Sequence, residues 1–209
     1  MRDEVIALKS PVGDRAGLLL ARLQGASKSY GQVRALCDVG FDVRAGEVLA
    51  LLGANGAGKS TALGLLTGRL SVDAGAVEVL GGDPRDAAIR RGIGVMLQEG
   101  GLPDTLRVAE HVRLFSTYYP NPRPLAETLA LAGLLDIAKR PYGALSGGQQ
   151  RRVQFALAIC GRPALMFVDE PTVGLDVESR RNFWAVLRQL RDEGTGIVLT
   201  TPRVTRSMT

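Results

Sequence analysis

The nine residues GANGAGKST, at positions 53–61, fit the pattern G-x-x-x-x-G-K-[ST] of a phosphate-binding loop. An apolar run, Val48–Leu52, precedes them, and a run of helical character, Thr61–Leu66, follows, so the loop joins a predicted strand to a predicted helix. The alternative is a glycine-rich turn without a ligand, which would not explain a lysine and a serine in this register. The sequence therefore predicts a site for a nucleoside triphosphate.

Each residue type in this loop has a chemical reason. Glycines let the backbone adopt dihedral angles at which several N–H groups point at one anion, and the following helix directs its positive end at the same phosphates. We expect Lys59 to reach the β and γ oxygens and Ser60 to offer its hydroxyl to Mg²⁺. The predicted nucleotide-binding residues of the loop are Gly53, Ala54, Asn55, Gly56, Ala57, Gly58, Lys59, Ser60 and Thr61.

Length and composition bound the class of protein. The chain of 209 residues has the length of one domain with a substantial core. Apolar runs stay well below the ~18 residues of a membrane-spanning helix, and the N-terminal sequence lacks the apolar core of a signal peptide. Cys37 and Cys160 lack metal-binding or redox spacing, so we expect two buried hydrophobic residues in a reducing compartment. The net charge of +5 comes from scattered arginines, which argues against a nucleic-acid partner.

The order of the predicted elements indicates an α/β fold in one domain, residues 18–209, after a flexible lead-in of residues 1–17. Turns at Tyr30-Gly31 and Ala45-Gly46 separate short strands, which suggests a small antiparallel β region before the core strand. We expect the three-layer, RecA-like core of a P-loop NTPase with a helical insertion at about residues 99–150.

Hydrophobic spacing also places the helices. Two helices of the insertion are expected at Leu106–Tyr118, with an N-cap at Thr105, and at Leu125–Ala138. The motif that begins at Leu145 opens a third helix, and a fourth is capped by Asp176.

A buried strand, Ala164–Val168, ends in the acidic pair Asp169-Glu170. Downstream of a phosphate-binding loop, such a strand supplies the second half of a nucleotide site. We expect Asp169 to hold Mg²⁺ and Glu170 to polarise a water aimed at the γ-phosphate; the alternative is a solvated turn. Phosphoryl transfer requires positioning and charge neutralisation more than covalent chemistry, so the metal, Lys59 and an oriented water would suffice.

Further segments resemble motifs of the ATP-binding cassette (ABC) ATPases. LSGGQQRR, residues 145–152, resembles the signature motif of that family, and LMFVDEPTVGLD, residues 165–176, resembles its Walker B strand, catalytic glutamate and D-loop. Gln98 matches the glutamine of the Q-loop, and Tyr30 matches the aromatic residue that stacks on adenine. The order and spacing of these motifs agree with the family from about residue 20 to residue 201.

The resemblance implies a head-to-tail dimer that holds two ATP molecules between its subunits. Each ATP would lie on one phosphate-binding loop and be covered by the signature residues of the partner. These residues begin a helix and lack bulk, which suits a γ-phosphate; the alternative is a plain serine N-cap. The implied roles are catalysis for Glu170, Gln98 and Lys59, Mg²⁺ binding for Ser60, Gln98 and Asp169, adenine stacking for Tyr30, partner contact for Ser146, Gly147, Gly148 and Gln149, and the D-loop for Asp176.

The resemblance also implies partners. They are integral membrane permease subunits and a second ABC ATPase subunit, identical or different, with this chain peripheral at the cytoplasmic face of the membrane. Residues 98–112, QEGGLPDTLRVAEHV, resemble cassettes of drug or antibiotic exporters. A non-transport ABC ATPase is the alternative, although the zinc-type cysteines, coiled coils or paired cassettes typical of that group are not present in the sequence.

The sequence departs from the family pattern after Thr201. The family places a histidine there, whereas this chain continues with Pro202, and its single histidine is His111 in the predicted insertion. The further helix and strands of the family have no counterpart, so we expect a fold that is incomplete at its C-terminus, with an exposed sheet edge. A frameshift or truncation would explain this. A second hypothesis is therefore a module that holds ATP without efficient hydrolysis.

Overall fold

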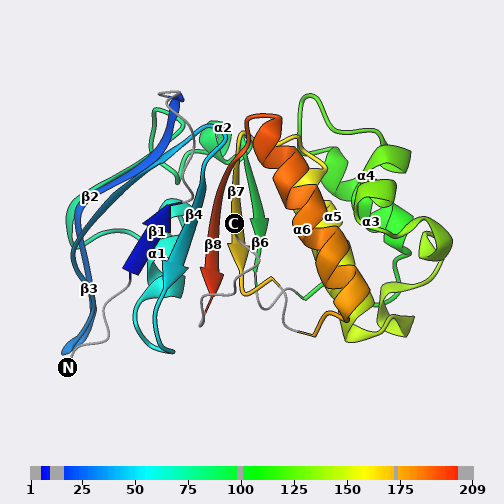
Figure 1. Ribbon diagram of the computed structural model, residues 1–209, viewed down its shortest axis with the longest axis horizontal. Helices are drawn as coiled ribbons and strands as arrows, with labels where there is room; N and C mark the ends of the chain where they lie inside the picture. Colours follow the sequence, from blue (N-terminus) through cyan, green and yellow to red (C-terminus); the bar gives the residue numbers. More distant parts are fainter. Residues whose placement is uncertain (1–5, 10–16, 98–100, 172–173, 202–209) are drawn as a thin grey trace.

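The computed structural model describes residues 6–9, 17–97, 101–171 and 174–201, and its elements form successive layers (Figure 1). An antiparallel sheet lies on the left of the view, helix α1 comes next, and a second sheet crosses the middle. The longer helices α5 and α6 cover the other face of this central sheet, and α3 and α4 lie beyond them. The elements are therefore mixed α/β, as the sequence predicts.

The central sheet brings the loop strand and the acidic strand close together. Its order is β1-β4-β8-β7-β6, with strands Ile6–Lys9, Val48–Leu52, Gly196–Thr201, Leu165–Asp169 and Ile93–Met96. Strands β4, β8, β7 and β6 are parallel, and β1 pairs antiparallel with β4. The four parallel strands are mostly apolar, which is typical of strands covered on both faces.

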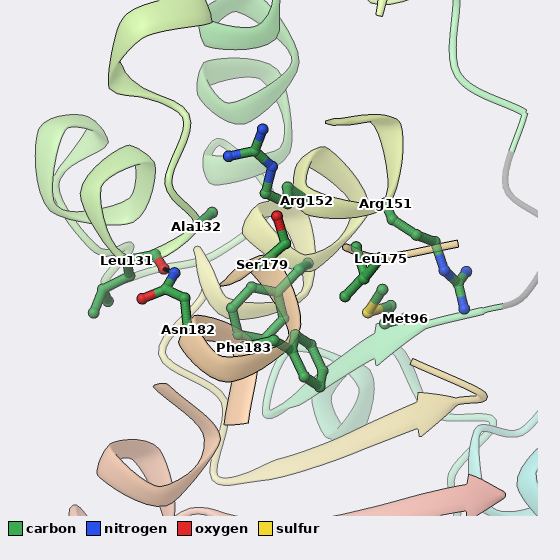
Figure 2. A pocket seen from close by; sticks show the side chains of 10 residues that line it. Met96, Leu131, Ala132, Arg151, Arg152, Leu175, Ser179, Asn182 and Phe183 are labelled. Atoms are coloured by element: carbon green, nitrogen blue, oxygen red, sulfur yellow. Dashed lines mark hydrogen bonds between the residues drawn. The ribbon is translucent and has the colours of Figure 1, made fainter. Parts of the chain in front are cut away.

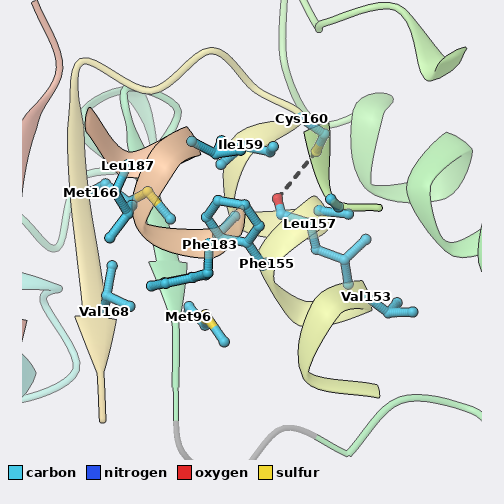
Figure 3. Close-up of a cluster of buried hydrophobic side chains, with 14 of the residues drawn as sticks. Met96, Val153, Phe155, Leu157, Ile159, Cys160, Met166, Val168, Phe183 and Leu187 are labelled. Atoms are coloured by element: carbon cyan, nitrogen blue, oxygen red, sulfur yellow. Dashed lines mark hydrogen bonds between the residues drawn. The ribbon is translucent and has the colours of Figure 1, made fainter. Parts of the chain in front are cut away.

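Successive residues of these strands alternate between two hydrophobic cores, because side chains along a strand point to opposite faces. Leu49 and Leu51 pack in the core that includes α1, whereas Ala50 and Leu52 pack in the core on the side of α5 and α6. Figure 3 shows the second core, in which Phe155 of α5 meets Phe183 of α6 with ring centroids 4.7 Å apart. Both faces of the central sheet are thus covered by apolar side chains.

The antiparallel region is larger than expected. Its sheet has the order β3-β2-β5, with strands Val33–Arg44, Leu19–Tyr30 and Ala74–Val79. The sequence suggested short strands here, but β2 is 12 residues long and reaches Tyr30 through several register shifts against β3. Tyr30 therefore lies at the end of a strand, beside the turn at Gly31.

The helices divide into those that pack on the central sheet and those of the insertion. Their bounds are Lys59–Leu66 for α1, Ala87–Arg90 for α2, Val108–Ser116 for α3, Leu125–Leu131 for α4, Gly147–Ile159 for α5 and Val177–Asp192 for α6, with short 3-10 turns at Leu135–Ile137 and Tyr142–Ala144. None of the helices in the described ranges combines the length and apolar character needed to cross a membrane.

Two predicted helix boundaries were wrong. Helix α3 begins after Arg107 rather than after Thr105, because the Glu110 side chain accepts the Arg107 N–H at 2.7 Å and completes the cap there. Helix α4 stops at Leu131 instead of continuing to residue 138, because Gly133 adopts a left-handed φ of 64° that ends the helix.

Two further features differ from the sequence expectations. The lead-in of residues 1–17, expected to be flexible, contributes strand β1, which pairs antiparallel with β4. Cys37 is exposed on β3, so it is not a buried hydrophobic residue as expected, whereas Cys160 is buried. Burial raises the pKa of the Cys160 thiol to about 11.

Candidate active site

The phosphate-binding loop leaves the carboxyl end of β4 and turns into α1. Gly58 is the N-cap of α1 and has a φ of 94°, which side chains rarely tolerate. A Cβ atom at Gly58 would lie 2.3 Å from the carbonyl oxygen of Ala35, so a side chain has no space there. The loop can therefore approach β3 only because this residue is a glycine.

Lys59 is held inside the loop. Its side chain is buried, and Nζ donates hydrogen bonds to the carbonyl oxygens of Gly53 at 2.7 Å and Ala54 at 2.9 Å. The loop thus carries a cation that is surrounded by its own backbone. The ammonium group is therefore already positioned at the loop before a phosphate binds.

An open hollow of about 420 Å³ lies over the loop. Its lining comes from β2, β3, the loop and the end of β7, and consists of Tyr30, Val33, Ala35, Asn55, Gly56, Gly58, Lys59, Ser60, Thr61 and Glu170. A second hollow of about 260 Å³, lined by Tyr30, Ser60, Thr61, Gly64, Arg69 and Leu70, shares three of these residues. The fold therefore brings Tyr30, Ser60 and Glu170 to one surface, although they are far apart in the sequence.

The acidic pair lies where β7 ends. Asp169 is buried, and its carboxylate accepts a hydrogen bond from the hydroxyl of Thr200 at the end of β8. The backbone N–H of Glu170 donates to the same hydroxyl oxygen at 3.1 Å. Glu170 has a φ of 44°, which is uncommon for a residue with a side chain. Sequence analysis did not identify Thr200, because its relation to Asp169 depends on strand pairing.

Arg151 from α5 contacts the same corner from the other side. Nη2 donates to the carbonyl oxygens of Asp169 at 2.8 Å and Glu170 at 2.9 Å, while Nη1 donates to Leu97 O at 2.5 Å. Burial lowers the pKa of Arg151, and the nearby carboxylates of Asp169 and Glu170 oppose that shift. The sequence offered Arg151 only as part of LSGGQQRR, and no local pattern indicates these contacts.

Figure 2 shows how differently two neighbouring arginines are placed. Arg151 extends towards the end of β6, whereas Arg152 turns the other way and donates to Gly133 O at 2.6 Å. The cavity between them and α6, drawn in the same figure, holds only about 10 Å³ and is too small for a nucleotide.

The signature residues form the start of α5. The Ser146 hydroxyl accepts the Gln149 N–H at 3.3 Å, and the Gln149 side chain accepts the Ser146 N–H at 3.0 Å, which forms a capping box. Ser146 and Gly147 are exposed, and Gly148 and Gln149 are half-buried. None of these four residues lines the hollow over the loop of the same chain.

Two predicted residues remain to be placed. Asp176 caps α6 and accepts hydrogen bonds from the Ser179 N–H at 2.8 Å and the Ser179 hydroxyl at 2.7 Å, and these bonds lower the pKa of Asp176. Gln98, predicted for catalysis and for the metal, lies outside the described residues. The single histidine, His111, is fully buried in α3 and contacts Pro103 O at 3.0 Å.

The donor set at the loop suits Mg²⁺. A hydroxyl on Ser60 and a carboxylate on Asp169 are hard oxygen ligands, and Mg²⁺ in phosphate sites takes one or two such protein ligands together with substrate oxygens. Within the described ranges, no group of three or more His, Cys, Asp or Glu side chains could hold a metal without help. A metal at this site would therefore depend on the phosphates as well as the protein.

Sequence comparison gives a consistent result. A family model described as ABC transporter matches residues 36–173. The chain is 37% identical over 193 residues to a probable ABC transporter ATP-binding protein of Azorhizobium caulinodans, with 88% of this chain and 69% of that protein covered. It is 38% identical to the Nod factor export ATP-binding protein I of Mesorhizobium japonicum, covering 92% of this chain and 59% of that protein.

The doxorubicin resistance ATP-binding protein DrrA of Mycobacterium tuberculosis is also similar, with 36% identity over 86% of this chain and 57% of that protein. The chain thus spans little more than half the length of this relative and of the Nod factor export protein.

Solved structures agree with the fold. An ATP-binding subunit of an ABC transporter superposes with a TM-score of 0.81 at 28% identity, covering 88% of this chain and 79% of the other. A bacterial ABC transporter cassette solved as a dimer superposes with a TM-score of 0.79 at 28% identity, covering 88% of each chain. The same cassette was also solved in a post-hydrolysis state bound to ADP and phosphate, with a TM-score of 0.79.

Proposed function

Because the chain belongs to the ABC transporter family of ATP-binding proteins, we propose that it binds and hydrolyses ATP and drives substrate export through membrane subunits. The observation that carries the proposal is the single hollow lined by Tyr30, Lys59, Ser60 and Glu170. These residues supply an aromatic ring, a cation, a hydroxyl and a carboxylate, which are the groups that ATP hydrolysis needs at one place.

Binding follows from the loop and the tyrosine. Tyr30 is 49% exposed at the mouth of the hollow, so its ring is free to stack on adenine. The N–H groups around Gly56 and Gly58, together with the N-terminus of α1, attract the phosphates. Lys59 exchanges its bonds to Gly53 O and Ala54 O for bonds to the β and γ oxygens.

Hydrolysis requires a water aimed at the γ-phosphate and neutralisation of the charge that develops. Glu170, at the rim of the hollow, orients and polarises that water, and Lys59 offsets the negative charge. Ser60, Asp169 and Gln98 would hold Mg²⁺, which would supply a further positive charge beside the phosphates.

A second copy of the cassette completes the site. The helix α5 begins with Ser146, Gly147, Gly148 and Gln149, which are exposed or half-buried, yet none of them lines the hollow of their own chain. In a head-to-tail dimer these residues cover the γ-phosphate of the partner, and Asp176 lies near the interface. A solved relative of this fold is dimeric, which supports the arrangement.

Opening and closing of that dimer would move membrane permease subunits, with this chain peripheral on the cytoplasmic face. The similarity to a drug-resistance protein and a Nod factor export protein favours export as the direction. Co-purification of a membrane protein with the tagged chain tests this part of the proposal. Capture of no permease would contradict it.

ATP binding is tested by titrating a fluorescent ATP analogue against the wild type and Lys59→Ala. We expect Lys59→Ala to weaken binding by about tenfold or more, because a charge-assisted bond to phosphate contributes about 1.5–3 kcal/mol. Lys139→Ala, at an exposed lysine away from the hollow, is the matched control and should bind as the wild type does. Equal affinity of Lys59→Ala and the wild type would contradict the proposed site.

A second candidate function is ATP binding without efficient hydrolysis. It is favoured by Thr201-Pro202, which stands where the family carries a histidine near the γ-phosphate. Binding and turnover measured on one preparation separate the two candidates. Binding without turnover would favour the second one.

A further inference from the structure

The backbone of Glu170 is held in an uncommon conformation. Its φ of 44° lies in the left-handed region, which residues with side chains seldom adopt. Such a conformation persists only where the surrounding structure fixes it, and it is often found at functional sites. The groups that fix Glu170 therefore bear on where its carboxylate points.

Two side chains bond to opposite ends of this residue. The Thr200 hydroxyl accepts the Glu170 N–H at 3.1 Å and donates to the Asp169 carboxylate. The Arg151 guanidinium donates to the carbonyl oxygens of Glu170 at 2.9 Å and Asp169 at 2.8 Å. Both side chains are buried, at 0% exposure for Thr200 and 8% for Arg151, so these bonds are shielded from water.

We propose that Arg151 and Thr200 are positioning residues, which clamp the Glu170 peptide so that its carboxylate faces the phosphate-binding loop. This inference rests on the proposed ATPase function and adds two residues to it. Neither residue touches the nucleotide hollow, because neither is among its lining residues. Both act on the backbone of Glu170, and Thr200 also bonds to the carboxylate of Asp169.

Arg151 also connects this corner to two other segments. It lies on α5, whose first turn carries the capping box of Ser146 and Gln149. Its Nη1 atom binds Leu97 O at 2.5 Å, at the point where the chain leaves β6. A planar guanidinium can hold carbonyls from two strands at once, whereas an ammonium group is a single point of charge. A shift of α5 would therefore move the Glu170 backbone directly.

The consequence for catalysis is a selective loss of rate. A general base that is displaced by about 1 Å loses roughly 10²-fold in rate, while binding through the loop is unaffected. The clamp thus predicts a fall in kcat with little change in KM for ATP. A purely structural role would instead lower the amount of folded protein and leave kcat per folded molecule unchanged.

Thr200→Val removes the hydroxyl and keeps the shape of the side chain, so the fold should survive. We expect kcat to fall by about 10- to 100-fold and KM to change by less than about threefold. Thr200→Ser restores the hydroxyl and should restore most of the rate. Thr128→Val is the matched control, because Thr128 is equally buried but bonds to the carbonyl oxygen of Pro124, the N-cap of α4, and its kcat should match the wild type.

Arg151→Lys keeps the positive charge but removes the planar guanidinium with its several N–H donors, and we expect a similar fall in kcat. Arg123→Lys is its control, because Arg123 is also buried, at 5% exposure, but pairs with Glu127 and lies outside the signature motif. Unchanged kcat in both Thr200→Val and Arg151→Lys would overturn the clamp, and so would equal falls in the two controls.

Amide hydrogen exchange tests the clamp without any turnover. The Glu170 N–H should be protected in the wild type and in Thr128→Val, and it should exchange at least about tenfold faster in Thr200→Val, since it loses its acceptor. Equal exchange in the wild type and Thr200→Val would overturn the clamp. If the wild type does not turn over ATP, the proposed function is contradicted. The exchange rate of the Glu170 N–H then still tests the clamp, because it does not depend on turnover.

Discussion

Single glycines are required by the backbone geometry at some positions, and the effect of replacing them on stability can be measured. Gly58 combines a φ of 94° with backbone at 2.3 Å from a built Cβ, whereas Gly31 has a φ of 59° and open space around it. The positive φ disfavours a side chain at both positions, but only at Gly58 would a Cβ atom also clash with a neighbouring backbone atom, Ala35 O.

We therefore expect Gly58→Ala to destabilise the protein more than Gly31→Ala does. A left-handed backbone costs an alanine about 1–2 kcal/mol, which applies to both variants, and the clash at Ala35 O adds to it at Gly58 alone. Urea unfolding of both variants measures the difference. Equal destabilisation by Gly58→Ala and Gly31→Ala would show that the loop can move to relieve the clash, and that its contact with Ala35 does not determine its conformation.

Secondary-structure elements show which parts of the fold are encoded locally. The starts of α5 and α6 were predicted correctly, because Ser146 and Asp176 bond to backbone only three residues away. The end of α4 and the length of β2 were not predicted. Gly133 stops α4 through its backbone angle, and β2 extends to Tyr30 because β3 pairs with it up to that residue.

The cap of α6 gives a pH-dependent prediction. Hydrogen bonds from Ser179 lower the pKa of Asp176 below its usual 3.8, so the ionised carboxylate is favoured in the folded protein. Its contribution to stability is therefore present above pH 3.8 and is lost as pH falls through the lowered pKa of the folded state.

Asp176→Ala should unfold at a lower urea concentration than the wild type at neutral pH, and the gap should narrow as the pH falls below the folded-state pKa. Asp176→Asn, which keeps the cap without the charge, should lie between the two at neutral pH. A gap that stays constant down to that acidic range would contradict the role of the carboxylate.

At the scale of the whole molecule, the sequence predicted the α/β class and the P-loop core, since the motifs are contiguous. It could not predict the corner where α5, β6, β7 and β8 meet. Arg151 reaches Leu97 and Asp169 across long stretches of chain, and Thr200 reaches Asp169 through strand pairing. The pairing of β1 with β4 was also missed, because the short run Ile6–Lys9 has no strong strand signal.

The proposed dimer can be tested without disturbing the fold. A Cβ atom at Gly147 would meet nothing within 4 Å, so Gly147→Asp should fold normally. Its carboxylate would face the γ-phosphate of a partner subunit, where like charges repel. In a Glu170→Gln background that retains ATP, we expect ATP-dependent dimers by light scattering and their loss on adding Gly147→Asp. Gly101→Asp, also in open space, is the control that should still dimerise.

The central claim is that this chain turns over ATP at Glu170. Steady-state release of phosphate, measured for the wild type and Glu170→Gln with ATP binding determined on the same samples, tests it most directly. We expect equal binding and a fall in kcat of about 10²- to 10⁴-fold for Glu170→Gln, as for loss of a general base. Equal phosphate release by the two proteins, or none by a wild type that binds ATP, would contradict the claim.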